Sequence, residues 1–326
     1  MKIKVLTIIA LAFCCNLANA LVVDYSVLSV NEEAGVDFTQ MTTENDFVAM
    51  PQVNRSGRKI NWLTNRIIDV SVDGRQLAYL SARNGTSNIF IKDIDRQGSS
   101  VQRTNRQSVL DFSYSPDGKY ICFSEKSGNY NQIFQTGSTS GFVCRQITSA
   151  NKDYSPVYSP DMKYIFFSRQ EGKGISVWSY NIANNFLSSY TKGHNVYPLR
   201  ESNSILCARI NSEGRGEIWK VNYSTGVEEC ILADPVKSFS TPQMSPNGKW
   251  IVLAGTSQLT HNSSVYNNID IYVCRPDGTR LTQITYHAAD DLSPVWSRDS
   301  NYIYFISQRG SANATANVWR ITFVEP

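Results

Sequence analysis

Residues 154–161 read YSPVYSPD, and residues 292–299 repeat the phrase as LSPVWSRD. With the second serine as a marker, the phrase returns along the chain at Ser71, Ser115, Ser159, Glu201 (a degenerate copy), Ser245 and Ser297. The spacings between markers are 44, 44, 42, 44 and 52 residues. A period near 44 residues fits a repeating unit of four short strands.

Each unit has the same internal order. The marker opens a turn such as SPDG at 115–118 or SPNG at 245–248, in which Pro, Asp or Asn, and Gly suit successive positions of a tight hairpin. An apolar strand such as YICF at 120–123 follows, then a strand with an aliphatic and aromatic pair such as Ile218-Trp219, then a polar strand. A continuously apolar strand is typical of one covered on both faces. The pattern predicts an all-β fold, a six-bladed β-propeller of four-stranded blades.

The two ends of the repeat region predict how the ring closes. The sixth unit stops after its third strand at 317–321, while residues 38–42, FTQMT, resemble the fourth strand LTQIT at 281–285. We therefore expect the N-terminal strand to complete the last blade and to remove two open sheet edges. Residues 51–63 carry one more copy of the strand-turn-strand phrase, interpreted as a relic hairpin; a seven-bladed ring, with the extra blade around 46–66, stays open as the alternative.

The first residues are typical of a targeting segment. Lys2 and Lys4 precede an apolar run, and residues 18–20, ANA, form a small-x-small cleavage site. The predicted division is a signal peptide at 1–20, an N-terminal extension at 21–37 and a propeller domain at 38–326. We expect a periplasmic or otherwise exported protein with no membrane-spanning segment; a lipid anchor on Cys14 or Cys15 is less favoured because bulky residues precede both.

Composition excludes some classes of function. The formal charge of +3 falls to +1 without Lys2 and Lys4, so the chain lacks the electrostatic footprint of a nucleic-acid-binding protein. Five cysteines follow the signal, an odd number placed singly, which predicts neither a disulfide framework nor a zinc site. Cys122 and Cys207 lie in apolar strands and are expected to be buried.

The repeat resembles that of the TolB-type propellers of bacterial envelopes. The shared features are the Ser-Pro-Asp-Gly turn, the apolar strand, a Ser-x-Arg segment and the third strand, and they extend over most of 38–326. The resemblance implies a propeller that binds a protein partner, in a family that also contains the propeller domains of some peptidases. The extension at 21–37 is too short for the small α/β domain that TolB carries, so a role in a Tol system does not follow.

The sequence gives no catalytic residues. A propeller peptidase needs a G-x-S-x-G nucleophile elbow, and the nearest string, GSTSG at 137–141, has Thr at the nucleophile position and is interpreted as a hairpin loop. We expect no enzyme activity, no cofactor and no metal site.

Candidate binding residues fall on one face of the predicted ring. We call it the loop face: the face formed by the connections between second and third strands and by those between blades. A basic residue recurs in the first class of connection, at Arg83, Lys126, Arg169, Arg215 and Arg309. Such a ring suits an acidic partner or a peptide carboxylate. The structural alternative is that these side chains brace adjacent blades.

Other candidates on the same face are histidines, tyrosines and aspartates. His194, His261 and His287 are predicted as solvated loop residues, and the insertion from Thr256 to Asn267 as a recognition loop. The tyrosines, which suit binding surfaces, are Tyr154, Tyr197 and Tyr266. Asp153 and Asp291 are expected to bond loop amides between blades.

The predicted function is therefore a non-enzymatic envelope propeller that binds a protein or peptide through its loop face. The alternative is a carbohydrate-binding or metal-assisted polysaccharide-active propeller, with a glycan as its partner, suggested by the histidines and tyrosines of the same face.

Overall fold

The computed structural model describes residues 37–51, 54–56, 59–61, 66–96, 98–139, 143–200, 202–261, 264–311 and 313–326. The side chains of 54–56, 59–61, 258–261 and 264–267 are not among those described. The predicted signal peptide and all of the extension except Asp37 therefore lie outside the described residues. Among the residues described, no helix is long and apolar enough to cross a membrane.

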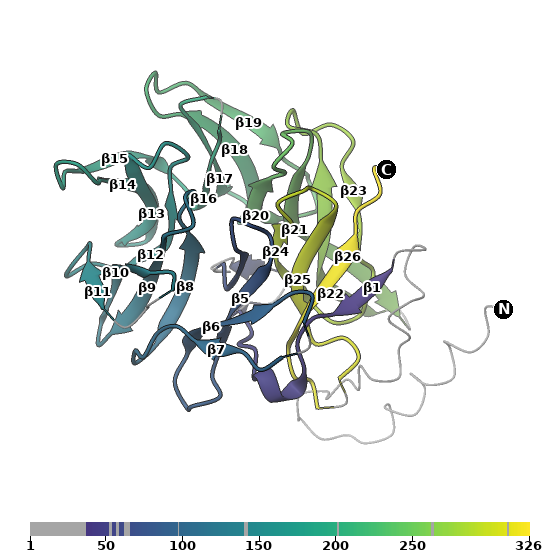
Figure 1. Ribbon diagram of the computed structural model, residues 1–326. Helices are drawn as coiled ribbons and strands as arrows, with labels where there is room; N and C mark the ends of the chain where they lie inside the picture. Colours follow the sequence, from purple (N-terminus) through teal and green to yellow (C-terminus); the bar gives the residue numbers. More distant parts are fainter. Residues whose placement is uncertain are drawn as a thin grey trace.

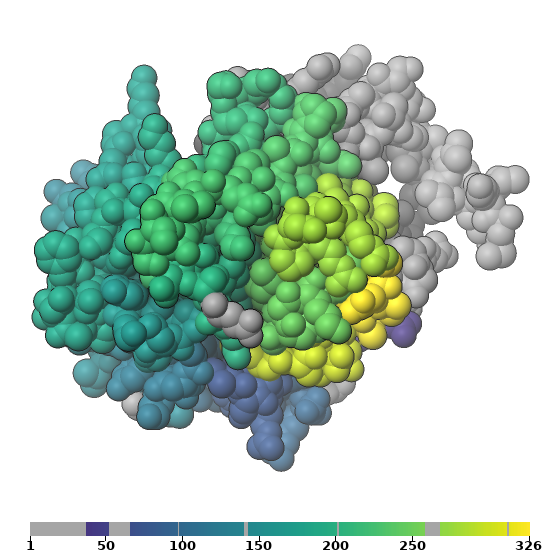
Figure 2. Space-filling view, turned by 90° about the horizontal axis from the view of Figure 1, so that it is seen from above, coloured from purple at the N-terminus to yellow at the C-terminus, as the bar shows by residue number. Residues whose placement is uncertain are grey.

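Six four-stranded antiparallel sheets form a six-bladed β-propeller, as predicted. The sequence colours run in order around the ring, from blue through teal and green to yellow, in both views (Figures 1 and 2). Blade 1 contains β4 (Ile68–Val70), β5 (Gln76–Ser81), β6 (Asn88–Asp93) and β7 (Val101–Gln102). Blade 2 contains β8 (Val109–Tyr114), β9 (Tyr120–Ser127), β10 (Tyr130–Gly137) and β11 (Cys144–Gln146). Blade 3 contains β12 (Asp153–Tyr158), β13 (Tyr164–Glu171), β14 (Gly174–Asn181) and β15 (Leu187–Lys192).

The second half of the ring follows the same order. Blade 4 contains β16 (His194–Pro198), β17 (Ser204–Ile210), β18 (Gly216–Asn222) and β19 (Glu228–Leu232). Blade 5 contains β20 (Phe239–Met244), β21 (Ile251–His261), β22 (Ser264–Cys274) and β23 (Thr282–Gln283). Blade 6 contains β24 (Asp291–Trp296), β25 (Tyr302–Ser307) and β26 (Asn317–Thr322), and its outer strand is β1 (Phe38–Gln40).

The N-terminal strand closes the ring, as predicted. β1 pairs antiparallel with β26, with Phe38 opposite Ile321 and Gln40 opposite Trp319, and the two strands lie side by side in Figure 1. The extra copy at 51–63 forms a separate two-stranded hairpin, β2 (Asn54–Ser56) with β3 (Lys59–Asn61), and adds no seventh blade.

The repeated turn owes its sequence to a set of hydrogen bonds. In blade 2 the hydroxyl of Ser115 donates to Asp117 over 2.6 Å and accepts the amide of Tyr120 over 2.9 Å. Gly118 takes a φ of 73°, where L side chains are disfavoured. The same bonds recur at Ser71, Ser159, Ser245 and Ser297. The marker therefore fixes the hairpin that joins the first two strands of each of these blades.

The core lies between neighbouring blades. The second strands are buried on both faces, as expected: Ile121, Cys122 and Phe123 have no exposed surface. Cys207 is also fully buried, which confirms its predicted role as a small core residue, and the five cysteines from Cys122 onward are all free.

Polar side chains join the innermost strands across several seams between blades. Asp69 Oδ2 accepts the amide of Tyr114 over 3.0 Å, and Asp111 Oδ2 accepts the amide of Ser155 over 2.9 Å. Between blades 5 and 6, the amide of Trp296 donates to Gln243 over 2.7 Å. These bonds hold the walls of the central channel in register.

Candidate functional site

Part of the loop face is covered by the chain itself. After β1, the amide of Met41 donates to the carbonyl of Val318 in blade 6 over 2.8 Å. The amide of Ala49 donates to the carbonyl of Leu80 in blade 1 over 2.9 Å. The segment 41–50 thus crosses from the last blade to the first. Its one helical turn, Glu44–Asp46, is a 3-10 turn.

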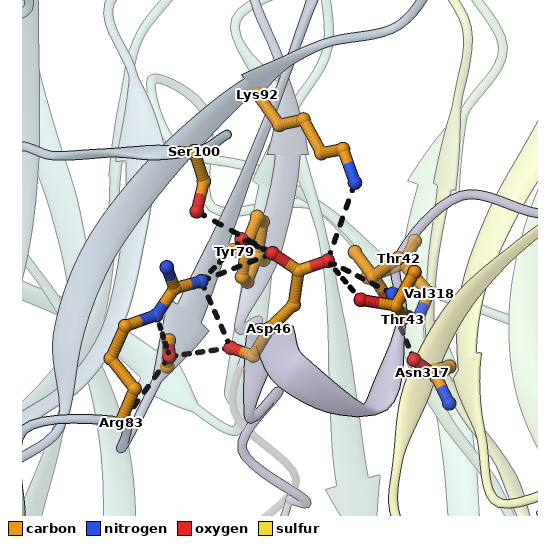
Figure 3. A network of polar contacts seen from close by, with 10 residues as sticks. Thr42, Thr43, Asp46, Tyr79, Arg83, Lys92, Ser100, Asn317 and Val318 are labelled. Carbon is orange, nitrogen blue, oxygen red and sulfur yellow. Dashed lines mark hydrogen bonds and ion pairs between the residues drawn. The ribbon is translucent and has the colours of Figure 1, made fainter. Parts of the chain in front are cut away.

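Asp46 anchors this segment to blade 1. Its carboxylate accepts hydrogen bonds from the hydroxyl of Tyr79 over 2.7 Å and from the guanidinium of Arg83 over 3.0 Å, and it pairs with Lys92 over 3.3 Å (Figure 3). Burial alone raises the pKa of Asp46, but the Thr43 amide, the Tyr79 hydroxyl and Lys92 together hold it below its ordinary value. Arg83 is therefore paired with a carboxylate of its own chain.

Two other members of the predicted basic ring are also paired internally. Arg169 makes two bonds to Asp153, over 2.6 and 2.9 Å, and Arg309 donates to Asp291 over 2.6 Å. All four side chains are buried. Each bond stays within one blade: Arg169 on β13 pairs with Asp153 on β12, and Arg309, which follows β25, pairs with Asp291 on β24. For these two pairs, the expectation that the arginines brace adjacent blades and that the aspartates bond loop amides is wrong.

The two remaining basic candidates lie nearer the surface. Arg215 is half-buried and pairs with Glu213 of its own turn. Lys126 is exposed on β9. Four of the five basic residues thus pair with four different carboxylates, and the side chain of Lys126 has no partner among the residues that the structure describes. They do not form one shared site.

His194 and His287 are buried, contrary to the expectation of solvated loops. His194 begins β16 and is 2% exposed, because blade 4 starts at this residue; its Nδ1 lies 2.6 Å from Asn195 Oδ1. His287 is 4% exposed, and its Nδ1 accepts the amide of Ala289 over 2.9 Å. Burial lowers the pKa of His194 to about 4, and burial with the nearby Arg309 charge lowers that of His287 to about 3. Both rings are neutral at pH 7.

The predicted recognition loop from Thr256 to Asn267 is largely a long hairpin. β21 and β22 stay paired from Ile251 opposite Cys274 to His261 opposite Ser264. The side chains of His261 and Tyr266 are outside those described. Tyr154 is 6% exposed, and burial raises the pKa of its hydroxyl.

Tyr197 packs against the core between blades 4 and 5. Its hydroxyl donates to the carbonyl of Met244 over 3.3 Å, and the guanidinium carbon of Arg66 lies 5.5 Å from the centre of its ring. Arg66 precedes blade 1 and Tyr197 belongs to blade 4, so the contact spans the channel between opposite blades.

A wide hollow lies on the other side of the ring. We call this side the turn face, because the hairpins that follow the first strands form it. The hollow has a volume of about 410 Å³, in the range typical of ligand sites. Its lining residues are Val72, Pro116, Arg200, Pro246, Asn247, Arg298, Asp299 and Ser300.

Two arginines give this hollow its charge. Arg298 Nε donates to the carbonyl of Ser71 over 3.2 Å and holds blade 6 against blade 1, yet its side chain stays 30% exposed. Arg200 is exposed, and no hydrogen bond or ion pair joins its side chain to another residue that the structure describes. The carboxylate of Asp299 is bonded within its own turn, to Ser297 over 2.5 Å and to Asn301.

Arg200 and Arg298 occupy equivalent positions of the repeat, but the marker predicted for blade 4 is two residues out of register. In blade 3 the amide of the marker Ser159 donates to the carbonyl of Tyr164, and in blade 4 the amide of Leu199 donates in the same way to the carbonyl of Ser204. The marker of blade 4 is therefore Leu199, not Glu201. The position after the marker is then Pro116, Pro160 and Pro246 in blades 2, 3 and 5, and Arg200 and Arg298 in blades 4 and 6. The departures from the repeat therefore gather at the channel mouth.

The described residues contain no group of three or more His, Cys, Asp or Glu side chains placed to hold a metal ion. His194 and His287, which motivated the metal-assisted alternative, are each buried against their own neighbours.

The molecule is thus a six-bladed propeller with a charged hollow on its axis. Residues 64–198 match the family model of the TolB beta propeller domain, which confirms the predicted resemblance. No curated protein matches the chain.

Solved structures share the architecture. Putative TolB from Agrobacterium tumefaciens has a TM-score of 0.59 and 16% identity over 82% of this chain and 95% of that one. TolB from Acinetobacter baumannii has the same TM-score and identity over 76% of this chain and 64% of its own. Oligogalacturonate lyase from Vibrio parahaemolyticus has a TM-score of 0.57 and 11% identity over 90% and 95%. At these identities the similarity shows the fold alone.

Proposed function

We propose that this protein is a non-enzymatic propeller of the cell envelope that binds a protein partner at the hollow of the turn face. The observation that carries the proposal is the pair Arg200 and Arg298, which replace the repeat's proline at the rim of a hollow of about 410 Å³. Arg200 is exposed, and Arg298 is 30% exposed although it also pairs with Asp69 over 3.5 Å. Arginines beside a concave surface suit a carboxylate-bearing segment of a partner. The signal-like residues 1–20 support export of the chain.

The loop face is the competing location. There Lys126 is the exposed member of the predicted basic ring, whereas Arg169 and Arg309 are buried in pairs. A partner on that face would meet the segment 41–50 first.

Photo-crosslinking distinguishes the two faces. A photoreactive amino acid is placed in the mature chain at Asn247, in the hollow, or at Lys126, on the loop face, and each protein is irradiated in envelope extract. We expect a crosslinked partner from Asn247 that is lost when Arg200→Glu is added. The matched control is Lys126→Glu, which makes the same charge change on the opposite face. A partner crosslinked only from Lys126, and insensitive to Arg200→Glu, would place binding on the loop face and sink the proposal.

A further inference from the structure

A second, smaller cavity lies inside the channel, apart from the hollow of the turn face. Its volume is about 20 Å³. Residues from the first strands of blades 3 to 6 line it together with Arg66, which precedes blade 1. Its polar members are Arg66, Ser155, Asn195, Thr241 and Ser293, with proline and valine between them.

An irregularity of the innermost strands places these groups around the axis. The first strands of blades 3 to 6 each contain a shift of register, for example between Tyr154 and Val157. The residue within the shift has a positive φ, of 53°, 52°, 50° and 53° at Ser155, Asn195, Thr241 and Ser293 respectively. A proline follows three of them, and proline cannot donate a hydrogen bond to the sheet. Each of these four blades therefore has a residue with a strained backbone conformation at the same position of its first strand, beside the cavity.

Two of the hydroxyls in this cavity lack a partner. Ser155 Oγ and Thr241 Oγ1 are buried and make no hydrogen bond within the described residues, and Ser155 as a whole is 8% exposed. A buried hydroxyl that lacks a hydrogen-bond partner destabilises the fold. Both hydroxyls can donate.

The cavity also holds an incompletely compensated positive charge. Arg66 is half-buried and forms no ion pair with a carboxylate of the described residues, and the adjoining residues 52–65 include no Asp or Glu. The Arg66 charge acts on the buried carboxylate of Asp111, but the oxygens of that carboxylate already accept the Ser124 hydroxyl over 2.5 Å and the Ser155 amide over 2.9 Å. A charge that is partly removed from water and has no paired counter-charge is unfavourable.

We propose that this cavity binds one small monovalent anion of the chloride class, held by the Arg66 guanidinium and the hydroxyls of Ser155 and Thr241. The volume exceeds the roughly 10–15 Å³ that one water needs and is too small for a larger organic anion. A water molecule would satisfy the hydroxyls but would leave the guanidinium charge uncompensated. The anion would connect blades 1, 3 and 5 at the axis.

Bromide, which replaces chloride and scatters anomalously, tests the site directly. Crystals of the mature chain grown in sodium bromide should show an anomalous peak in contact with Arg66 and Ser155. In solution, the melting temperature of the wild type should be higher in sodium chloride than in sodium gluconate at equal ionic strength, because a ligand that binds only the folded chain stabilises it.

Variants separate a bound anion from a general salt effect. Arg66→Met, and separately Ser155→Ala with Thr241→Val, should remove the difference between chloride and gluconate. The matched control Lys126→Met, an exposed charge on the loop face, should keep it. If Arg66→Met does not fold, the hydroxyl variant carries the test. Equal melting temperatures in the two salts and no bromide peak in the cavity would overturn the proposal and leave a site for water.

Discussion

The guanidinium of Arg309 donates to Asp291 Oδ2 over 2.6 Å, and neither side chain has any exposed surface. The pair joins the first strand of blade 6 to the connection that follows its second strand, in the blade that β1 completes. Arg309 also lies over the rings of Phe38 and Phe305, at 4.3 and 5.0 Å from their centres. Arg309 therefore contacts both the Asp291 carboxylate on the first strand of blade 6 and the ring of Phe38 on the closing strand β1.

Removing one partner of this pair should be strongly destabilising. Arg309→Met leaves the Asp291 carboxylate buried and unpaired, and we expect a loss of about 3–5 kcal/mol in the free energy of unfolding. Urea unfolding at pH 7 measures it, with Lys126→Met as the control, expected within about 0.5 kcal/mol of wild type. The double variant Arg309→Met with Asp291→Leu should recover part of the loss. Equal stability of Arg309→Met and the control would contradict the assignment.

Asp46 should contribute to stability only while it is ionised. We expect Asp46→Asn to lose about 1–3 kcal/mol at pH 7, because the bonds from Arg83 and Lys92 weaken. The folded pKa of Asp46 is lowered, so this contribution is complete above the unfolded value of about 4 and disappears as the pH falls through the folded pKa. Wild type and variant should converge in acid. Glu229→Gln, on the exposed strand β19, is the control, and a gap that persists unchanged at low pH would be inconsistent with this role.

The buried histidines should make the fold less stable in mild acid. Below about pH 6.5 the unfolded chain takes up protons that His194 and His287, with pKa values of about 4 and about 3, do not accept in the fold. Stability therefore falls as the pH drops from about 6.5 to 4, by up to about 1.4 kcal/mol per pH unit for each proton. Asp111 opposes this: burial raises its pKa to about 6, so the folded chain binds that proton first.

Single substitutions separate these opposing effects. His194→Asn should flatten the dependence of stability on pH between 6.5 and 4, and Asp111→Asn should steepen it. Denaturant midpoints at pH 7, 6, 5 and 4 give the slopes. Identical slopes for His194→Asn and wild type would show that the ring titrates in the fold.

The closing strand should depend on Phe38. Its ring packs edge-on against Phe305, with centres 6.3 Å apart. We expect Phe38→Ala to cost about 1–2 kcal/mol, since the side chain is half-buried. Hydrogen exchange should quicken along β26 and remain as in wild type along β13. Phe186→Ala, at a ring 66% exposed, is the control. Unchanged exchange along β26 would mean that β1 is held by its backbone alone.

The repeat predicted the architecture because the marker serine, the turn glycine and the apolar second strand each perform a local task that every blade needs. Ring closure was predicted for the same reason: FTQMT is recognisably a fourth strand. The site was harder to predict. The burial of His194 depends on tertiary packing. Arg83 and Arg169 bond to Asp46 and Asp153, which lie 37 and 16 positions away, and the repeat period does not reveal such partners. Arg200 was missed because the degenerate fourth marker was placed two residues too late.

The pairing of β1 with β26 also determines when, during synthesis, the ring can close. Residues 38–40 leave the ribosome early, but the strand that they pair with, Asn317–Thr322, is made some 280 residues later. Throughout synthesis the first strand has no native edge to join, and the last blade stays incomplete until nearly the whole chain is present. Contacts so distant in sequence are slow to form and leave strand edges open to other chains. The export proposed above would be favoured by this delay, because translocation requires a polypeptide that has not yet closed its ring.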